Sequence, residues 1–512
     1  MNLVRFGLFF FVICFIGCSN TVSSSSGDEQ FAEENSSSSK DNGKNEGKSS
    51  SSQSSDENSE ECVGESGSPW DGTTAKEFAC GSGTKLSPYV ILNAEQLAHL
   101  SFIVGGNDAD YIGKYYKLGA DILLNDGKII NDKGALVADS SKLHKWTPIG
   151  NSSVAFSGHF DGNGYTISGM FINTTSSHNG LFGNVSGSVS NLTVENSWVT
   201  GGKFTGGIIG YNTGKLKNLA NKSSVTSISG PVGGVIGSSR NSYGKVSLID
   251  SIFNFGVVKG KNDVGGVFGF IDRIKLTYVE NYGLVEGQKY TGGIWGGAQS
   301  TTVEANNLLN RGNITGEEYV GGIAGYCGHY GVGSSYSAKC GSLKNVKNEG
   351  SIEGAFFVGG IAGTFGGEVS VASNKSAIVG VNYIGGLFGN VDFSTTTSLY
   401  NTGDVAGSKY VGGIIGYNKE GVTSSAYSTG SVDGDSLVGL MIGYNYNTTM
   451  ADYYYLEQGE LEPFGENNGG GVATPKTASE MKTEDFAELV GEDFVYDSGL
   501  NDGYPVLSWE VE

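Results

Sequence analysis

The sequence predicts an all-β protein whose body is one parallel β-solenoid of about ten rungs, each close to 27 residues long, with short capping helices at both ends. Three observations predict this fold. A Gly-rich pentapeptide recurs along the chain, an Asn landmark keeps a constant distance to the next pentapeptide, and equivalent positions of successive repeats hold β-branched residues. Together they indicate one chain winding through a repeated turn rather than several separate domains.

The pentapeptide Gly-Gly-apolar-apolar-Gly is the strongest of these signals. Copies begin at Gly206, Gly233, Gly265, Gly292, Gly321, Gly359, Gly385 and Gly412, and degenerate copies begin at Asn179 and Gly439. Successive copies lie 27, 27, 32, 27, 29, 38, 26, 27 and 27 residues apart. The segments between them are short and rich in Val, Ile, Thr and Tyr. A 27-residue turn of three short strands suits a three-sided coil, in which each strand pairs with its equivalent in the next rung.

An Asn residue marks a second point of each repeat, 11 positions before the next Gly pair. It is found at Asn254, Asn281, Asn310, Asn348, Asn374 and Asn401. The arc from each Gly pair to the next Asn instead measures 21, 16, 18, 27, 15 and 16 residues. All length variation therefore falls on one side of the repeat, where a solenoid carries its loops and often its binding face.

The columns of equivalent residues indicate a packed interior. The residue before each Gly pair is Thr205, Val232, Val264, Thr291, Val320, Val358, Ile384, Val411 or Val438. Three positions after the first Gly, the bulky Phe268 and Trp295 are followed by Ala324 and Ala362. Such volume compensation is typical of a close-packed core.

These motifs resemble the GLUG-motif repeat family, through Gly-Leu-Phe-Gly at residues 180–183 and 386–389. The resemblance covers residues 178–450, and segments 116–122, 146–150 and 160–169 resemble the lead-in of such proteins. It implies a secreted or surface-attached solenoid whose repeats are not catalytic. Some members of the family are fused to immunoglobulin-cleaving metallopeptidases.

The N-terminus resembles a bacterial lipoprotein signal peptide over residues 1–18. Arg5 precedes a short apolar run that ends in Phe15-Ile16-Gly17-Cys18, similar to a lipobox in which Cys18 is lipidated. A lipobox usually has Leu at its first position, where this chain has Phe15. The residue after the Cys is Ser19, which resembles an outer-membrane sorting signal. The alternative is an ordinary cleaved signal that discards Cys18.

The regions that flank the repeats differ from them in composition. Residues 19–61 are Ser-rich and acidic, as in a disordered tether. Residues 62–177 are expected to form an N-terminal cap and lead-in strands, with a helix at 93–100 that starts at an Asn cap. The repeats occupy residues 178–450. An acidic C-terminal cap follows at 451–512, with a short helix from Ser479 to Leu489.

The charge distribution excludes a nucleic-acid partner. The net charge is −21, of which residues 19–61 carry −7 and residues 451–512 carry −13, so that the repeats are nearly neutral. No segment supplies the basic stripe that binding to phosphates needs.

The cysteines that follow the signal segment predict two disulfides in an oxidising compartment, Cys62 with Cys80 and Cys327 with Cys340. The second pair brackets the longest insertion. A four-Cys zinc site is disfavoured because no close Cys-x-x-Cys pair is present.

The chain lacks the motifs of common enzymes. His-Glu-x-x-His, a phosphate-binding loop and Gly-x-Ser-x-Gly are absent. Arg273-Ile274-Lys275 resembles only one element of a pectin-hydrolase signature. Asp161 reads as a turn residue, and Asp493, Asp497 and Asp502 as solvated charges. We therefore expect no catalytic residue, no metal and no cofactor.

An aromatic residue stands two positions before the Gly pair in most repeats. Its members are Phe204, Tyr290, Tyr319, Phe357, Tyr383 and Tyr410. If the β-branched neighbours point inward, these rings point outward and form a ladder that could stack on sugar rings or contact a protein. The alternative is a structural stack at a corner of the coil.

These features predict a non-enzymatic, lipid-anchored protein of the cell envelope, at the outer membrane or cell surface, that acts as an adhesion or binding scaffold. Its partners would be the membrane, through the lipid anchor, and a glycan or a surface protein. The alternatives are a carbohydrate-binding lipoprotein and a polysaccharide-active β-helix enzyme.

Overall fold

In the computed structural model, residues 61–512 form one compact unit, and the structure describes residues 62, 67–109, 112–299, 302–328 and 340–511. The predicted signal peptide, the lipidation site at Cys18 and the tether up to residue 61 lie outside the described residues. Within the described ranges, no helix is long and apolar enough to cross a membrane.

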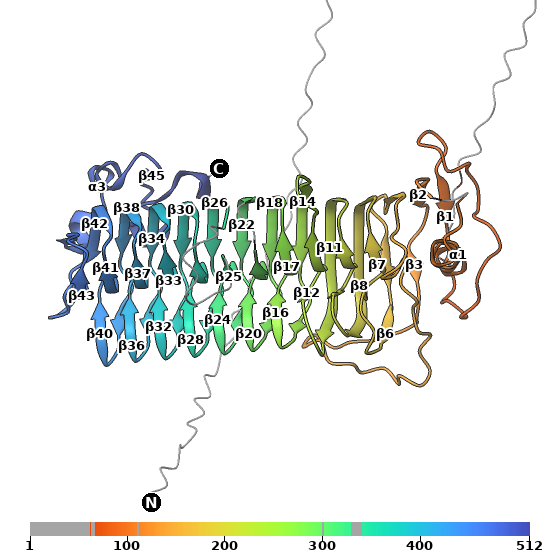
Figure 1. The fold of residues 1–512 in the computed structure, drawn as a ribbon, viewed down its shortest axis with the longest axis horizontal. Helices are drawn as coiled ribbons and strands as arrows, with labels where there is room; N and C mark the ends of the chain where they lie inside the picture. Colours follow the sequence, from red (N-terminus) through yellow and green to blue (C-terminus); the bar gives the residue numbers. More distant parts are fainter. Residues whose placement is uncertain (1–61, 63–66, 110–111, 300–301, 329–339, 512) are drawn as a thin grey trace, which may run out of the picture. The chain divides into compact units, whose positions relative to one another are not determined.

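The predicted parallel β-solenoid is confirmed (Figure 1). Its strands form three long sheets, here called the wide sheet (24 strands), the second sheet (11 strands) and the third sheet (9 strands). A typical rung runs through β18 (Ile274–Asn281) and β19 (Val285–Glu286) in the wide sheet. It continues through β20 (Lys289–Gly292) in the third sheet and β21 (Trp295–Ala298) in the second sheet. Because the second sheet alone holds 11 strands, the coil is slightly longer than the ten pentapeptides indicate.

The long strands of the wide sheet in the other repeats are β8 (Ser188–Gly201), β11 (Lys215–Ser227), β14 (Ser247–Asn254), β22 (Val303–Asn310), β26 (Ser342–Asn348), β30 (Glu368–Asn374), β34 (Thr395–Asn401), β38 (Val422–Ser428) and β42 (Thr449–Leu456). Its short strands are β15 (Val258–Lys259), β23 (Ile314–Thr315), β27 (Ile352–Glu353), β31 (Ile378–Val379), β35 (Val405–Ala406) and β39 (Val432–Asp433).

The other strands of the third sheet are β9 (Thr205–Gly206), β12 (Val232–Gly233), β16 (Asn262–Gly265), β24 (Glu318–Gly321), β28 (Phe356–Gly359), β32 (Asn382–Gly385), β36 (Lys409–Gly412) and β40 (Ser436–Gly439). Those of the second sheet are β7 (Phe182–Val185), β10 (Ile209–Asn212), β13 (Ile236–Arg240), β17 (Phe268–Asp272), β25 (Ala324–Cys327), β29 (Ala362–Phe365), β33 (Phe388–Asp392), β37 (Ile415–Lys419), β41 (Ile442–Tyr446) and β43 (Phe464–Asn468).

The strands pair in the register that the repeats predict. The β-branched residues before the Gly pairs are neighbours from rung to rung, as are the Gly residues themselves; Val320, for example, pairs with Thr291 and with Val358. In the second sheet, Trp295 pairs with Phe268 on one side and with Ala324 on the other, and all three are fully buried. One apolar core extends from the N-terminal cap to the last rungs.

The Asn landmark forms a buried hydrogen-bonded ladder at the bend between the long and short strands of the wide sheet. Each side-chain amide donates to the side-chain oxygen of the Asn in the next rung, over 2.7–2.9 Å, from Asn221 through Asn401. Each also donates to the carbonyl oxygen two residues later, as Asn281 does to Gly283 at 2.9 Å. Buried amides keep such bonds because an unpaired polar group is costly away from water.

The second Gly of each pair is required by close packing against this ladder. A Cβ atom at Gly293 would lie 2.4 Å from the side-chain oxygen of Asn310 and 2.0 Å from the carbonyl oxygen of Gly322. The Asn and the Gly pair are therefore both locked in register in the rungs that hold Asn221 through Asn401. This explains why the 11-residue arc between them has a constant length.

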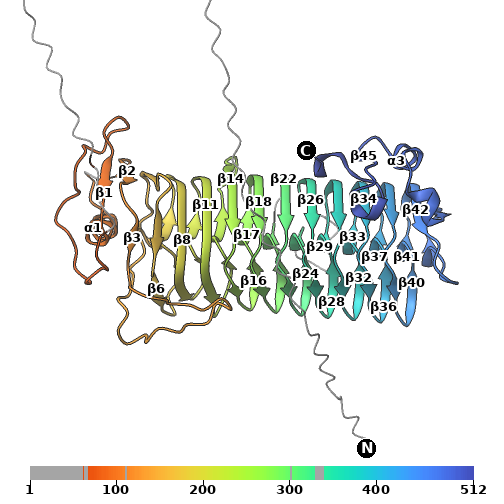
Figure 2. The same cartoon turned by 180° about the vertical axis from the view of Figure 1, so that it is seen from behind.

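After the last rung, the C-terminal segment folds back along the flank of the coil (Figures 1 and 2). After β44 (Thr474–Lys476) it forms α2 (Ala478–Met481), α3 (Glu484–Val490), β45 (Phe494–Val495) and β46 (Val506–Leu507). The single helix predicted from Ser479 to Leu489 is thus divided into two short helices by a break at Lys482 and Thr483, and both belong to the segment that lies on the outer face of the wide sheet. The reason is a column of apolar rings there, Tyr400, Tyr427 and Tyr454, which Phe486 and Phe494 cover.

This segment ends in a buried ion cluster. The Glu510 carboxylate, 2% exposed, lies 2.8 Å from the ammonium group of Lys347 and 3.0 Å from that of Lys375. It also accepts hydrogen bonds from Tyr400 and Ser373. Burial opposes its ionisation, but the two ammonium groups and the hydrogen bonds outweigh burial, and the pKa of Glu510 is lower than its ordinary value.

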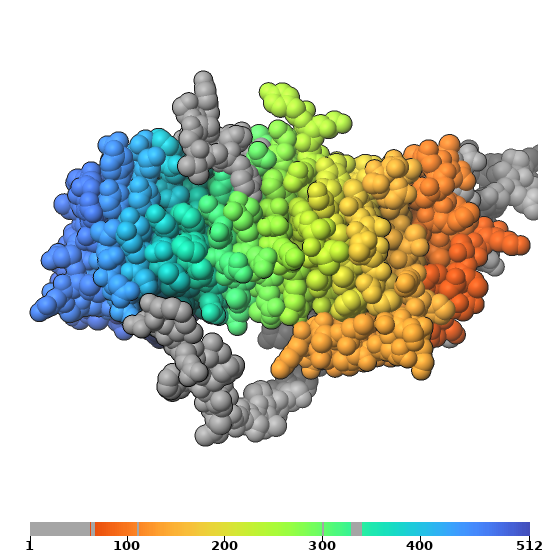
Figure 3. Space-filling model, turned by 60° about the horizontal axis from the view of Figure 1, so that its bottom comes forward, coloured from red at the N-terminus to blue at the C-terminus, as the bar shows by residue number. Residues whose placement is uncertain are grey.

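The lead-in begins with β1 (Tyr89–Ile91), β2 (Tyr115–Leu118), β3 (Ile122–Leu123), β4 (His159–Asp161), β5 (Thr166–Ser168) and β6 (Phe171–Asn173). Residues 124–158, here called the lead-in loop, connect β3 to β4. The segment leaves the coil after β3 and rejoins it before β4, because Ile149 and Phe156 form parallel bridges to Phe182 and Val185 of the next rung. In Figure 3 the orange segment at the lower edge lies along the neighbouring yellow rungs.

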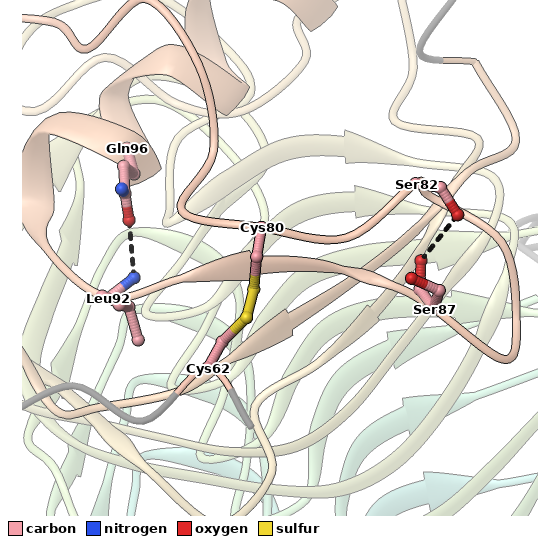
Figure 4. The surroundings of a disulfide bond; sticks show 6 residues. All are labelled: Cys62, Cys80, Ser82, Ser87, Leu92 and Gln96. Carbon is pink, nitrogen blue, oxygen red and sulfur yellow. Dashed lines mark hydrogen bonds between the residues drawn. A yellow bond between two sulfur atoms is a disulfide. The ribbon is translucent and has the colours of Figure 1, made fainter. Parts of the chain in front are cut away.

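The N-terminal cap contains the predicted helix, α1 (Ala94–Gly105). As predicted, the Asn93 side chain caps the helix and accepts a hydrogen bond from the Gln96 backbone. The Gln96 side chain accepts one from the Leu92 backbone (Figure 4). The helix buries Leu97, Leu100 and Ile103 in the common core. The structure joins Cys62 to Cys80 beside this helix, as the sequence predicts (Figure 4).

Candidate functional site

The aromatic residues predicted to contact a ligand form a continuous stack along the third sheet, two positions before the Gly pair of each rung. Tyr290, Tyr319, Phe357, Tyr383 and Tyr410 follow one another with ring centroids 5.1, 4.8, 4.5 and 4.6 Å apart. Their planes are inclined by 27°, 4°, 9° and 9°. We call these five residues the aromatic corner.

The backbone explains why the rings point outward. All five residues have φ between 56° and 62°, in the left-handed region, whereas the next residue of each rung, such as Val358, is fully buried. A bulky residue in this region costs about 1–2 kcal/mol. Stacking of neighbouring rings, worth about 0.5–1.5 kcal/mol for each pair, offsets part of that cost.

The stacking limits how the aromatic corner can bind. Phe357 has Tyr319 against one face and Tyr383 against the other, so its ring faces are occupied. A sugar cannot stack on the faces of these inner rings, which corrects the binding mode considered from the sequence. The five residues are partly exposed, so a partner can still contact the parts of the rings that are not stacked. Burial raises the pKa of Tyr383, with a further contribution from Tyr410, so its hydroxyl stays neutral.

A second aromatic column, which the sequence analysis missed, lies beside the aromatic corner. Its members stand five residues after the first Gly of the pair, on the outer face of the second sheet, and are Tyr211, Phe270, Tyr326, Tyr417 and Tyr444. Non-aromatic residues interrupt this column, and Tyr417 and Tyr444 stack in adjacent rungs at 5.1 Å. Tyr326 meets Tyr319 edge-on at 5.9 Å, and Tyr444 meets Tyr410 at 6.0 Å. The fixed spacing from the Gly pair was the signal that would have revealed it.

Two lysines border the aromatic corner. The Lys289 ammonium group lies 5.2 Å from the ring centroid of Tyr290 and 2.9 Å from the Glu318 carboxylate of the next rung. The Lys409 ammonium group lies 4.7 Å from the ring centroid of Tyr410. The surface thus combines ring edges, hydroxyls and cations, a composition typical of contact with polar ligands or proteins.

The insertions all emerge at one corner, as the repeat lengths predict. They join a second-sheet strand to the next long strand of the wide sheet, between β13 and β14, β21 and β22, and β25 and β26. The structure joins Cys327 at the end of β25 to Cys340, so a disulfide closes the longest insertion. In the first insertion Tyr243 is 94% exposed, and the Arg240 guanidinium lies 3.8 Å from the ring centroid of Phe270.

The acidic residues considered from the sequence are dispersed. Asp493 accepts a hydrogen bond from Ser398, while Asp161 accepts one from the Asn163 backbone in a turn, as expected. Among the described residues, no group of three or more His, Cys, Asp and Glu side chains could hold a metal ion.

Comparisons with known proteins gave partial matches. No family model matches the chain. Over 128 residues, 24% of this chain, it is 38% identical to a candidate Gly-rich membrane protein of Evansella cellulosilytica, of which the match covers 13%. Over 143 residues, 27% of this chain, it is 34% identical to Halomucin of Haloquadratum walsbyi, of which the match covers 1%. The chain thus matches only a small part of each relative.

Among solved structures, the chain is similar to a candidate immunoglobulin A1 protease from Bacteroides ovatus. The TM-score is 0.38 at 18% sequence identity, and the superposition covers 84% of this chain and 95% of the other.

Proposed function

We propose that this protein is a non-enzymatic scaffold of the cell surface that belongs to the GLUG-motif repeat family. Cys18 would carry its lipid anchor in the outer membrane, and the solenoid would serve adhesion to a surface protein or glycan. The proposal rests chiefly on the alignment of all insertions at one corner of a long coil. The partial similarity to a membrane protein supports a place in the envelope.

The packing of the coil supports recognition on its outside. The interior is filled from the cap to the last rung by one apolar cluster and the Asn ladder. A ligand must therefore meet outward side chains, and the repeats offer equivalent contacts on successive rungs. Several weak contacts on one rigid body bind more tightly together than any one of them does alone.

The test uses intact cells that express the full chain or the Cys18→Ala variant. We expect added protease to release the solenoid from cells with the natural chain, and metabolic labelling with a fatty acid to mark this chain but not the variant. Cells with the natural chain should also adhere better to a matrix of host or neighbouring-cell glycoproteins. An unlabelled natural chain, or one protected from protease, would refute the surface anchor.

The alternative function is a carbohydrate-binding or polysaccharide-active β-helix protein. Release of reducing sugars from pectins or hemicelluloses by the purified chain would establish the enzymatic form of this alternative. Binding of these polymers without release would favour the non-catalytic form.

A further inference from the structure

A hollow in the described surface lies between the lead-in loop and the flank of the coil. Its volume is about 310 Å³, near the lower end of the ~300–1,000 Å³ of small-molecule sites. Its lining includes Asn131 and Asp132 of the loop and Glu195, Lys222, Phe255 and Val257 of the coil.

The loop is held firmly over this pocket. The Asn196 side chain of β8 accepts a hydrogen bond from the Ile129 backbone at 2.9 Å and donates one to the Gly127 carbonyl oxygen at 2.8 Å. At the tip, Gly134 has φ of +72°, and a Cβ atom there would lie 2.8 Å from the Val257 side chain. Because the tip contacts the coil directly, the loop forms a fixed wall of the pocket.

The floor of the pocket is an aromatic ring with one covered face. Phe255, 45% exposed, stacks on Tyr282 of the next rung at 4.8 Å and 11°. The Arg311 guanidinium lies 5.4 Å from the ring centroid of Tyr282 and pairs with Glu349 at 2.8 Å. Because Tyr282 covers the C-terminal side of the Phe255 ring, the other face is directed to the preceding rung, where Lys222 lines the pocket. Phe255 is 45% exposed and has the side chain of Lys222 rather than a ring on its preceding side, which distinguishes it from the inner rings of the aromatic corner.

The walls supply both hydrogen-bond donors and acceptors. Glu195 and Lys222 face each other at 3.8 Å and are about half-exposed, so either can also bind a ligand. Asp132 lies on the outer rim at the loop tip, where its side chain is 96% exposed and pairs with Lys128 at 2.9 Å. The Asn131 side-chain oxygen accepts hydrogen bonds from the Lys133 and Ala135 backbones, which leaves its amide nitrogen for a ligand.

We propose that this pocket binds one neutral pyranose residue of a glycan, an inference that rests on the proposed function as a surface-binding protein. The C–H face of a pyranose packs on the negative face of an aromatic ring. Its hydroxyls both donate and accept, which matches a rim with carboxylates, an ammonium group and an amide. Each lysine at the rim is already paired with a carboxylate, Lys222 with Glu195 and Lys128 with Asp132, so a uronic acid or a sulfated sugar gains no net attraction there.

The test measures binding of the chain from Ser19 to Glu512 to methyl glycosides of glucose, galactose, mannose and N-acetylglucosamine, with glucuronic acid as the anionic probe. Saturation-transfer NMR detects binding, and calorimetry gives the Kd. We expect at least one neutral glycoside to bind and glucuronic acid to bind more weakly. Phe255→Ala should raise the Kd about tenfold, the value of a lost aromatic face.

Matched variants separate the pocket from general effects. Tyr243→Ala removes an equally large aromatic ring outside the pocket and should leave the Kd unchanged. Gly134→Val keeps every lining side chain but displaces the loop, so it should weaken binding as Phe255→Ala does. If Phe255→Ala fails to fold, Phe255→Leu keeps the apolar volume and removes only the ring.

The outcomes also distinguish this inference from the proposed function. No saturable binding of any neutral glycoside, or equal binding by the natural chain and the Phe255 variant, overturns the pocket. If cells with the Phe255 variant still adhere as strongly as cells with the natural chain, the scaffold function stands without this pocket. Binding that depends on Phe255 in a chain that never reaches the surface would support the pocket and refute the scaffold.

Discussion

Removing one amide from the middle of the Asn ladder should destabilise the coil far more than removing an exposed amide of the same type. Asn281→Ala deletes four hydrogen bonds at once. The Asn281 side chain donates to Gly283 at 2.9 Å and to Asn310 at 2.8 Å, and it accepts from Asn254 at 2.8 Å and from the Gly283 backbone at 3.2 Å.

The magnitude follows from the groups left without partners. The site is fully buried, so both backbone groups of Gly283 and one polar group on each neighbouring Asn lose a partner away from water. At about 1 kcal/mol for each of the four groups, the lower end of the usual range, the free energy of unfolding should fall by about 4 kcal/mol. Asn313→Ala is the matched control, because this exposed side chain accepts one hydrogen bond, from the Ser351 backbone at 3.2 Å. It should cost about 1 kcal/mol or less.

Denaturant unfolding and hydrogen exchange by mass spectrometry measure this difference. Neighbouring repeats of a solenoid stabilise each other, so we expect faster exchange in the peptides around residues 254–256, 281–283 and 310–312, and less change in distant rungs. Equal losses of stability for the Asn281 and Asn313 variants would show that the ladder is not a main support of the fold.

Three further predictions concern other parts of the coil. Burial raises the pKa of Asp263 from 3.8 to about 6, so the folded chain holds a proton there that the unfolded chain has lost, and stability should fall by up to about 3 kcal/mol as the pH rises from about 4 to 6. Asp263→Asn should abolish this slope in urea titrations across that range, and an unchanged slope would assign it to other groups. Peptide mapping without reduction should find Cys327 linked to Cys340, whereas free thiols at both positions would contradict the pairing. Glu510→Gln removes the buried carboxylate that pairs with Lys347 and Lys375, so it should cost about 3 kcal/mol and free the C-terminal segment for limited proteolysis, a change that resistance equal to the natural chain would disprove.

The repeated part of the fold could be predicted from the sequence because each rung repeats the same short motifs. The Gly pair, the Asn and the β-branched residue recur at set distances, and parallel in-register pairing follows once each is placed above its equivalent. Even the outward direction of Tyr319 followed from the inward direction of Val320. What the pattern left open was how densely the rings would stack, since that depends on the spacing of the rungs and on the left-handed backbone at the corner.

The parts that occur once could not be predicted in this way. The lead-in loop docks through Asn196 and Gly134, which no repeat marks. The return of the C-terminal segment depends on Glu510 reaching Lys347, more than a hundred residues earlier in the chain. Such contacts are long-range and have no equivalent in another rung against which a pattern could be checked.

This difference bears on where the protein can bind small ligands. A regular column uses one rung to cover the next, so Phe357 in the aromatic corner presents an edge and two occupied faces. Phe255 also stacks on the following rung, but its column changes to Lys222 on the preceding side, and the lead-in loop closes over that interruption. A solenoid of this type should therefore meet extended partners along its regular corners and enclose single sugar residues only where a non-repeated segment lies against an interruption in a column. Extending the ring column by Lys222→Phe would test this reasoning, because the added ring should stack on the face of Phe255 directed to the preceding rung and abolish glycoside binding while the coil remains folded.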